Sequence, residues 1–196
     1  MGKIVALHPV EGRKEELSDE ALLSGCTAGD AAALAALYDR LEDDVRRCLV
    51  RLTWIDDHLV DDLVQDTFLE VFASAASFKG NASVRSWVLG ITANLARKHV
   101  RGDSRRKERQ RLYVERTDNR DRDPGTEAEN RELVAHLQEA LAELPHPQRE
   151  AFVLCDVEGL SGVEAARALD IPRGTLYRRL HTARTTLREA LGGDPS

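Results

Sequence analysis

The chain has 196 residues, 42% of them hydrophobic and 32% charged, with a formal net charge of −6. This length fits one domain or two small ones, and the acidic balance excludes a uniformly basic nucleic-acid binder. The cysteines, Cys26, Cys48 and Cys155, are too few and too widely spaced for a disulfide framework or a cysteine-rich zinc site, which favours a reducing compartment. No apolar stretch approaches 18 residues and the N-terminus carries no secretory signal, so we expect no membrane insertion.

The first part of the chain predicts a tail followed by helices. Residues 1–16 are polar and predict a flexible tail. Ser18 precedes two acids and predicts a helix N-cap, and Gly29-Asp30 predicts a second cap. Apolar residues then recur at three- and four-residue steps from Leu34 to Leu52, which predicts a long amphipathic helix.

An acidic helix is predicted from Asp61 to Phe72. Between Leu41 and Glu70 there are nine Asp or Glu against three Lys or Arg. An apolar stripe is predicted on one face, formed by Leu59, Leu63, Phe68, Leu69 and Phe72. The acids then lie outside the stripe, either as a simple solvated face or as a surface that holds a partner.

A short polar loop, residues 77–83, leads into a helix that becomes basic. Val84, Trp87, Val88, Ile91 and Leu95 predict its buried face, and residues 97–111 hold eight Lys or Arg against two acids. Phe78 and Trp87 could stack on exposed bases. A lone aromatic at helical spacing is more often part of a core, so we expect Trp87 to be at least partly buried.

Residues 105–129 predict a flexible linker, because charges alternate and Pro124-Gly125 breaks any helix. Beyond it, Ser161-Gly162-Val163-Glu164 predicts a capping box, and Asp170-Ile171-Pro172 a turn. The next helix, 173–191, carries five Arg and no acid between Arg173 and Arg188. Two helices across a short turn, the second one basic, are typical of a helix-turn-helix, although an ordinary hairpin with a solvated basic face shares the pattern.

Catalysis is poorly supported by the sequence. The six histidines are scattered without metal-ligand spacing, and there is no phosphate-binding glycine motif or nucleophile elbow. The pairs Asp56-Asp57 and Asp61-Asp62 could bind Mg²⁺, but paired acids on a helix surface are usually solvated. We therefore expect a protein that is not an enzyme and needs no cofactor or metal.

Several segments, in order, resemble the extracytoplasmic-function (ECF) sigma factors of the sigma-70 family. Residues 61–69, DDLVQDTFL, resemble the family's polymerase-docking helix, and residues 77–87, SFKGNASVRSW, its promoter-melting segment. Residues 144–150, LPHPQRE, and 158–161, EGLS, resemble the entry to its C-terminal helix-turn-helix. Residues 171–181, IPRGTLYRRLH, resemble its recognition helix.

The resemblance implies an all-α fold with two small helical domains joined by a flexible linker, the C-terminal one a helix-turn-helix. The N-terminal domain, called region 2 in this family, would span residues 17–104. The linker would span 105–129, and the C-terminal helix-turn-helix domain, called region 4, residues 130–192. The partners would be the clamp and flap of core RNA polymerase, promoter DNA and an anti-sigma factor, in the bacterial cytoplasm. The function would be recognition of the −35 and −10 elements, promoter melting and transcription initiation.

The resemblance also implies site residues in three sets. Core-polymerase contacts would come from the acidic helix: Asp61, Asp62, Gln65, Asp66 and Phe68. The −10 element would contact the loop and the basic helix: Phe78, Lys79, Asn81, Ser83, Arg85, Trp87, Asn94, Arg97, Lys98 and Arg101. The −35 element would contact the recognition helix: Arg173, Thr175, Tyr177, Arg178, Arg179, His181 and Arg184.

Asp170 stands where the family usually has Gly, and Asp tolerates positive φ better than most residues, so we expect the turn to survive. Tyr177-Arg178 stands where Lys-Ser is common, which bears on the −35 preference. Two other hypotheses remain at this point. One is a stand-alone DNA-binding regulator whose N-terminal half senses or dimerises. The other is a helical enzyme with a carboxylate metal site, which would need inward-facing acids in Glu-x-x-His register, and we identify none.

Overall fold

The helices begin where the sequence supplies caps. The computed structural model describes residues 17–53, 57–111 and 128–192. Helix α1 (Asp19–Thr27) starts after Ser18, whose hydroxyl accepts from the Ala21 amide at 3.2 Å. Helix α2 (Ala31–Thr53) starts after Asp30, whose carboxylate accepts from the amides of Ala32 and Ala33. Both predicted caps are therefore confirmed, and they fix where the chain turns.

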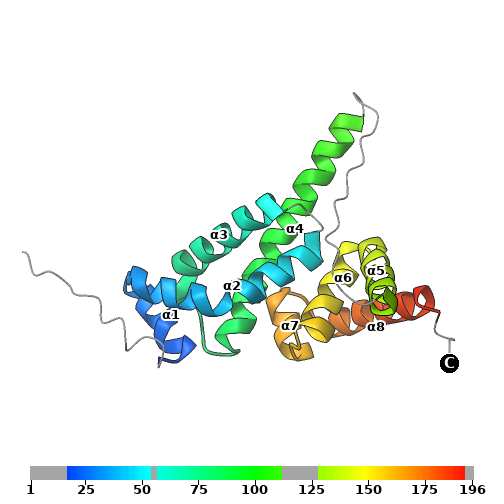
Figure 1. The fold of residues 1–196 in the computed structure, drawn as a ribbon. Helices are drawn as coiled ribbons and strands as arrows, with labels where there is room; N and C mark the ends of the chain where they lie inside the picture. Colours follow the sequence, from blue (N-terminus) through cyan, green and yellow to red (C-terminus); the bar gives the residue numbers. More distant parts are fainter. Residues whose placement is uncertain (1–16, 54–56, 112–127, 193–196) are drawn as a thin grey trace, which may run out of the picture.

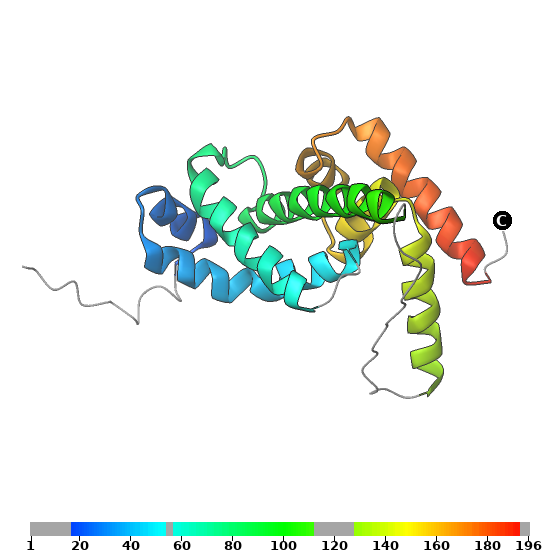
Figure 2. The ribbon, with the colours of Figure 1, turned by 90° about the horizontal axis from the view of Figure 1, so that it is seen from above.

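The N-terminal domain is a bundle built around α2. Helix α1, helix α3 (Asp57–Ser74) and helix α4 (Val84–Arg111) pack against it, and the short 3₁₀ turn η1 (Ala75–Ser77) contacts α1 and α3 (Figures 1 and 2). The long amphipathic helix predicted from the sequence is confirmed, because α2 buries a continuous stripe at helical spacing. That stripe consists of Ala33, Leu37, Leu41, Val45, Cys48, Leu49 and Leu52.

The buried face of α3 differs from the predicted stripe. Its core residues are Val60, Leu63, Val64, Thr67, Phe68 and Val71. Leu59 and Leu69, assigned to the stripe, are 39% and 57% exposed. The prediction was wrong for these two residues because Val60, Val64 and Val71 complete a face at i, i+4 and i+11 that leaves Leu59 and Leu69 outside it.

Helix α4 extends past residue 104, where the sequence predicts the N-terminal domain to end. It continues to Arg111, so residues 105–111 of the predicted linker are helical. The remainder of that linker, 112–127, and the predicted tail, 1–16, lie outside the described residues. At 28 residues and about 1.5 Å per residue, α4 extends well beyond the bundle, as Figure 1 shows.

The C-terminal domain contains α5 (Ala128–Glu143), α6 (His146–Phe152), a π turn η2 (Val153–Val157), α7 (Gly162–Ala168) and α8 (Arg173–Ala190). The predicted capping box is confirmed at the start of α7. Ser161 Oγ accepts from the Glu164 amide at 3.3 Å, and the Glu164 carboxylate accepts from the Ser161 amide at 3.0 Å. Asp170 in the turn before α8 has φ of 51°, the left-handed conformation that the sequence analysis allowed for.

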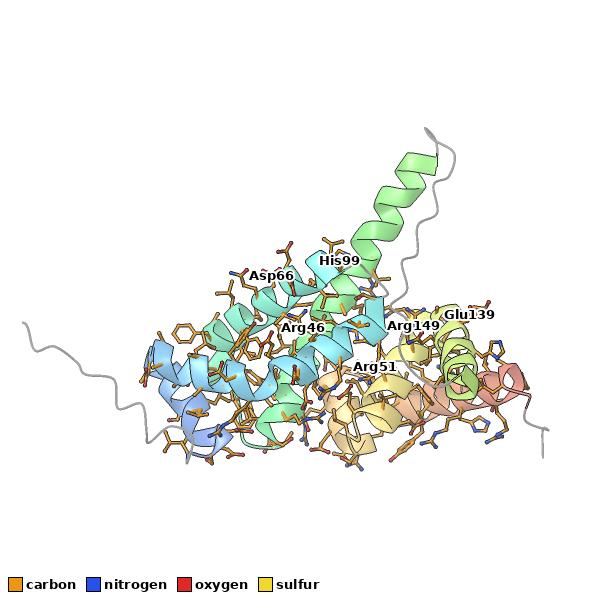
Figure 3. All side chains as sticks on the ribbon, viewed as in Figure 1. Arg46, Arg51, Asp66, His99, Glu139 and Arg149 are labelled. Carbon is orange, nitrogen blue, oxygen red and sulfur yellow. The ribbon has the colours of Figure 1, made fainter. Side chains whose placement is uncertain are left out.

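A buried arginine ties the C-terminal domain together. Arg149 on α6 donates to the carbonyls of Leu141, Ala142 and Leu144 at the end of α5, at 2.8, 2.6 and 3.0 Å. The last carbonyls of a helix have no partner inside it, so the guanidinium supplies one. Its remaining bond, 3.2 Å to the carbonyl of Leu52, reaches α2 in the other domain (Figure 3).

The two domains lie side by side in the structure. Helix α7 packs on α4, and η2 and α6 contact α2 (Figures 1 and 2). One buried apolar cluster includes residues from both domains, among them Leu89, Ala93 and Leu169. None of the helices in residues 17–53, 57–111 and 128–192 combines the length and apolar character needed to cross a bilayer.

Candidate nucleic-acid and partner interfaces

The exposed face of α3 is acidic and carries one large apolar side chain at its edge. Asp62, Gln65 and Asp66 are exposed, and Asp61, 58% exposed, pairs with Arg46 of α2 at 2.6 Å (Figure 3). Leu69 lies on the same side of the helix, one turn beyond Gln65 and Asp66. In contact with a basic, partly apolar partner, the leucine can supply apolar contact area and the neighbouring carboxylates can supply charge.

Phe68, predicted as a docking residue, lies instead in the core. Its side chain is 3% exposed, and its ring contacts Tyr38 of α2 with the ring centroids 4.6 Å apart. Phe68 therefore packs α3 onto α2, and the apolar side chain available to a partner on this face is Leu69. The sequence could not separate these two neighbours, since both are apolar and adjacent.

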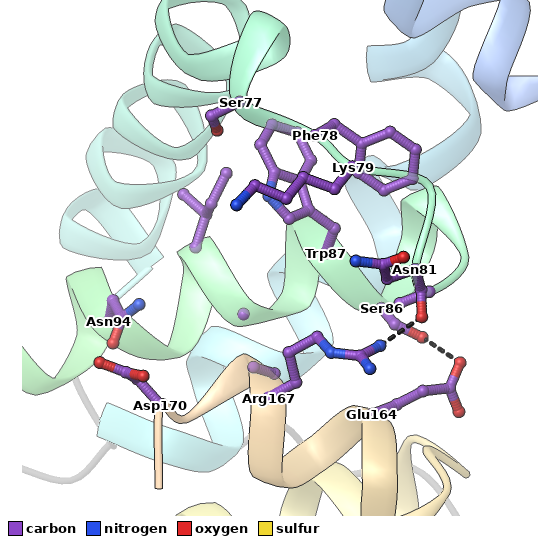
Figure 4. Close-up of a pocket in the computed structure, with 14 residues that line it drawn as sticks. Ser77, Phe78, Lys79, Asn81, Ser86, Trp87, Asn94, Glu164, Arg167 and Asp170 are labelled. Carbon is purple, nitrogen blue, oxygen red and sulfur yellow. Dashed lines mark hydrogen bonds between the residues drawn. The ribbon is translucent and has the colours of Figure 1, made fainter.

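The loop after η1 and the first turns of α4 form one wall of a cleft of about 300 Å³ (Figure 4). Trp87 is half-buried, as expected, and its ring meets that of Phe78 edge-on with centroids 5.5 Å apart. Five residues predicted to contact the −10 element line this cleft: Phe78, Lys79, Asn81, Trp87 and Asn94. An aromatic pair beside amide side chains and a lysine can stack on a base and hold its backbone.

The opposite wall of the cleft comes from the C-terminal domain. Glu164, Arg167 and Ala168 of α7 and Asp170 of the following turn line it. Arg167 donates to the Asn81 carbonyl, and Ser86 Oγ donates to Glu164 Oε1 at 2.9 Å (Figure 4). Five of the ten predicted −10 residues are thus gathered in one cleft, and residues of the C-terminal domain occupy part of the space in front of them.

Two of the predicted −10 arginines are held by acids of the C-terminal domain. Arg85 donates to Glu158 Oε2 and to the Glu158 carbonyl, both at 2.9 Å, and also pairs with Asp44. Arg97 donates to Glu150 Oε1 at 2.7 Å, and the Glu150 side chain is 1% exposed. Burial raises the pKa of Glu150, whereas the hydrogen bond from Arg97 lowers it.

The other predicted −10 residues are arranged differently. Lys98 and Arg101 are exposed on α4, beyond the part covered by α7. Ser83 Oγ lies 2.7 Å from Ser86 Oγ and accepts from the Ser86 amide at 3.1 Å, so it caps the start of α4. Ser83 therefore has a structural role that the sequence analysis did not assign to it.

Helix α8 presents most of its predicted −35 residues to solvent. Arg173, Tyr177, Arg178 and His181 are exposed, while Thr175 and Arg179 are half-buried. Arg184, 52% exposed, instead makes a two-bond pair with Asp156 at 2.6 and 2.8 Å. The exposed residues lie in the N-terminal turns of α8, the part of a recognition helix that meets base edges.

The sequence analysis missed the acids that pair with Arg85 and Arg97 of α4. Glu150 and Glu158 lie in motifs that were assigned to domain entry, and each meets a basic residue about 50 or more positions earlier in the chain. Both acids are buried in the structure. Helical periodicity in the sequence gives no sign of this burial. Within the described residues, no three His, Cys, Asp or Glu side chains lie together as a metal site would require.

Comparison with known proteins gives matches to two family models. One, described as Sigma-70 region 2, covers residues 37–106, and the other, described as Sigma-70, region 4, covers residues 135–187. The chain is 34% identical over 182 residues to the ECF RNA polymerase sigma factor SigM of Mycobacterium tuberculosis, covering 92% of this chain and 88% of that protein. It is 29% identical to the ECF RNA polymerase sigma-E factor of Haemophilus influenzae, over 90% of this chain and 97% of that one.

Solved structures agree on the fold. CnrH, solved in complex with the cytosolic domain of CnrY, superposes with a TM-score of 0.65 at 24% identity, over 90% of this chain and 99% of that one. The sigma factor RpoE of Bartonella quintana, solved with the anti-sigma factor NepR, gives 0.63 at 24% identity, over 81% and 96%. At this identity the likeness concerns the fold alone.

Proposed function

The chain belongs to the ECF sigma factors of the sigma-70 family, and from this we propose that it directs core RNA polymerase to a set of promoters. It acts as a non-catalytic initiation subunit in the bacterial cytoplasm. The observation that carries the proposal is the match of both DNA-contacting regions, 2 and 4, in one chain in the family's order. A stand-alone regulator would need only the helix-turn-helix.

Core docking is assigned to the exposed face of α3. Asp62, Gln65, Asp66 and Leu69 form a small acidic surface with an apolar residue at its edge. This surface suits a basic, partly apolar groove, and the family resemblance identifies that groove as the clamp of the polymerase large subunit. Asp61 contributes less, because Arg46 already neutralises it at 2.6 Å.

Promoter recognition is divided between the domains. The loop and α4 bind an unpaired base of the −10 element in the cleft beside Phe78 and Trp87. Extruding a base costs a few kcal/mol, which stacking and backbone contacts offset. The N-terminal turns of α8 read the −35 element, with Arg178 able to fork onto a guanine or to contact a phosphate.

We propose the domain limits predicted from the sequence, with region 2 over residues 17–104, the linker over 105–129 and region 4 over 130–192. Region 4 also binds the polymerase flap. We further propose an anti-sigma factor as a partner; the RpoE protein of Bartonella quintana, which shares this fold, was solved in complex with one.

The experiment that tests the function is transcription in vitro. The purified chain is added to sigma-free core polymerase from the same or a closely related bacterium, with a library of promoter fragments as template. Specific transcripts, whose start sites identify both promoter elements, are the expected result. Silence, together with no association with that core polymerase, would favour the stand-alone regulator.

A charge reversal tests the docking surface separately. Asp66→Arg is expected to weaken core binding at least about tenfold, since it opposes like charges across the contact. Asp39→Arg, the same change at an exposed position of α2, is the matched control and should bind core normally. Equal core affinity of the two variants would remove α3 from the docking assignment.

A further inference from the structure

The first turn of α7 lies against the side chain of Tyr177 on α8. A Cβ placed on Gly162 would lie 2.5 Å from the Tyr177 hydroxyl oxygen, 2.8 Å from Cζ and 3.1 Å from Cε1. Non-bonded carbon atoms pack about 3.5–4.0 Å apart, so not even an alanine fits at residue 162 while the tyrosine keeps this position. Gly162 opens α7 with a φ outside the left-handed region, so the tyrosine requires the glycine and the backbone does not.

The contact with α7 gives the exposed tyrosine a fixed direction. On either side of it along α8, Leu176 and Leu180 are buried at 0% and 5% exposed, and they anchor the helix. Tyr177 itself is 54% exposed. The atoms nearest to Gly162 are the hydroxyl oxygen, Cζ and Cε1, so the polar tip of the ring is turned to α7. The opposite edge, Cδ2 and Cε2, faces away from α7 and is apolar.

The free edge of this ring lies on the surface that the proposed function assigns to the −35 element. Arg173 and His181, four residues before and after Tyr177 on the same side of α8, are exposed, as is Arg178. Cationic side chains contact phosphates or the acceptors of guanine, whereas an apolar ring edge has no donor to offer. In the major groove, apolar groups recognise thymine by contact with its C5-methyl group.

Holding the ring before DNA arrives favours recognition. A tyrosine with no neighbour on a helix surface samples several rotamers, and binding has to order it. The backbone of α7 restricts Tyr177 in advance, because the ring rests on a residue that has no side chain. A side chain whose direction is set by its surroundings presents the same edge to each base pair that it meets.

We propose that Gly162 is a positioning residue for promoter recognition: it holds the ring of Tyr177 in the direction that contacts the C5-methyl group of a thymine in the −35 element. Gly162 touches no base itself and acts through Tyr177. The inference deepens the proposed function and rests on it for the identity of the DNA. The contact between the two residues is a property of the free chain, and it is measured without DNA.

Removing one methyl group from the DNA tests the inference. Each thymine of the −35 element found by the transcription experiment is replaced in turn by deoxyuridine, which lacks only the C5-methyl. The affinity of the chain bound to core polymerase should fall about fourfold at one thymine, the effect of burying one methyl-sized apolar group. Tyr177→Ala should abolish this difference between thymine and uracil, and Gly162→Ala should remove most of it. Tyr177→Phe should retain it, because the hydroxyl faces α7.

Controls separate positioning from a structural role. Gly162→Ala should unfold in urea at or above the wild-type midpoint, since alanine suits a helix and the displaced atoms are the free end of a side chain. Gly102→Ala, on α4 with no atom within 4 Å of an added Cβ, should keep the full difference between thymine and uracil. The same difference in wild type and Gly162→Ala, or a −35 element with no methyl-sensitive thymine, would overturn the inference.

A measurement on the free chain distinguishes this inference from the proposed function. The chain has three tyrosines, so 3-fluorotyrosine labelling gives few fluorine NMR signals, and Tyr177→Phe identifies that of Tyr177. Gly162→Ala should move this signal and leave that of Tyr38, in the N-terminal domain, in place. An unmoved Tyr177 signal would overturn the contact. If the signal moves but the wild-type chain with matched core polymerase binds no promoter, the proposed function fails, and the role in −35 recognition fails with it.

Discussion

Replacing Arg149 with Met tests how the C-terminal domain is held together. Methionine keeps an unbranched apolar stem of similar length but removes all four hydrogen bonds that the guanidinium donates. Three of these bonds, to the carbonyls of Leu141, Leu144 and Leu52, are buried. At about 1–1.5 kcal/mol for each buried carbonyl left without a partner, Arg149→Met should lower the free energy of unfolding by about 3–5 kcal/mol.

The assay is urea unfolding followed by circular dichroism and by tryptophan fluorescence. For a slope of about 1.5 kcal/mol/M, the expected loss lowers the circular-dichroism midpoint of the affected domain by about 2–3 M. Both tryptophans, Trp54 and Trp87, precede the linker in the sequence, and Trp87 also lines the cleft beside α7, so fluorescence reports the N-terminal domain together with its contact to α7. Arg188→Met, at an exposed position of α8, is the control and should change stability by no more than about 0.5 kcal/mol. A loss below about 1 kcal/mol for Arg149→Met would refute the argument that these carbonyls depend on the guanidinium.

Three further predictions concern single side chains. Phe68→Ala should destabilise the N-terminal domain by about 3–5 kcal/mol in urea unfolding, whereas Leu69→Ala should leave stability nearly unchanged and weaken core binding; the opposite pattern would reverse their assigned roles. Arg178→Ala should cost about 1–3 kcal/mol at the −35 element in a binding titration, and an equal loss on every sequence would indicate a phosphate contact instead. Burial, together with neighbouring arginines, lowers the pKa of His146 to about 4. The neutral imidazole therefore stabilises the fold fully above about pH 6.5, and the free energy of unfolding falls by at most about 3 kcal/mol as the pH drops toward 4. The stability difference between the wild type and His146→Gln should therefore change across that range, and a constant difference would contradict the assignment.

Local features of this fold were predictable because they depend on neighbouring residues in the sequence. The caps at Ser18 and Asp30 and the capping box at Ser161 each follow from a residue type at a short spacing. The buried stripe of α2 follows from helical periodicity. The two-module organisation followed in the same way from the charged segment between two helical halves.

The features that were missed depend on contacts between distant segments. Phe68 and Leu69 could be told apart only after the positions of α2 and α4 were known. Arg85 and Arg97 were assigned to DNA alone, because nothing in the sequence brings Glu158 or Glu150 beside them. Long-range charge pairing is decided by how the two domains pack, and one sequence contains no direct record of that packing.

The π turn η2 has a consequence for how this protein can change by mutation. Its wide turn, in which the Glu158 amide reaches back to the Val153 carbonyl at 2.8 Å, contains one residue more than an ordinary helical turn would. Deleting one residue from 153–157 would restore a regular helix and rotate whatever follows by about 100°. Glu158 would then turn away from Arg51 and Arg85, and α8 would rotate relative to α5 and α6, on which it packs. The extra residue of η2 therefore sets two things at once, the packing within the C-terminal domain and the ion pairs of Glu158 with α2 and α4, so the length of this turn should tolerate no single-residue change.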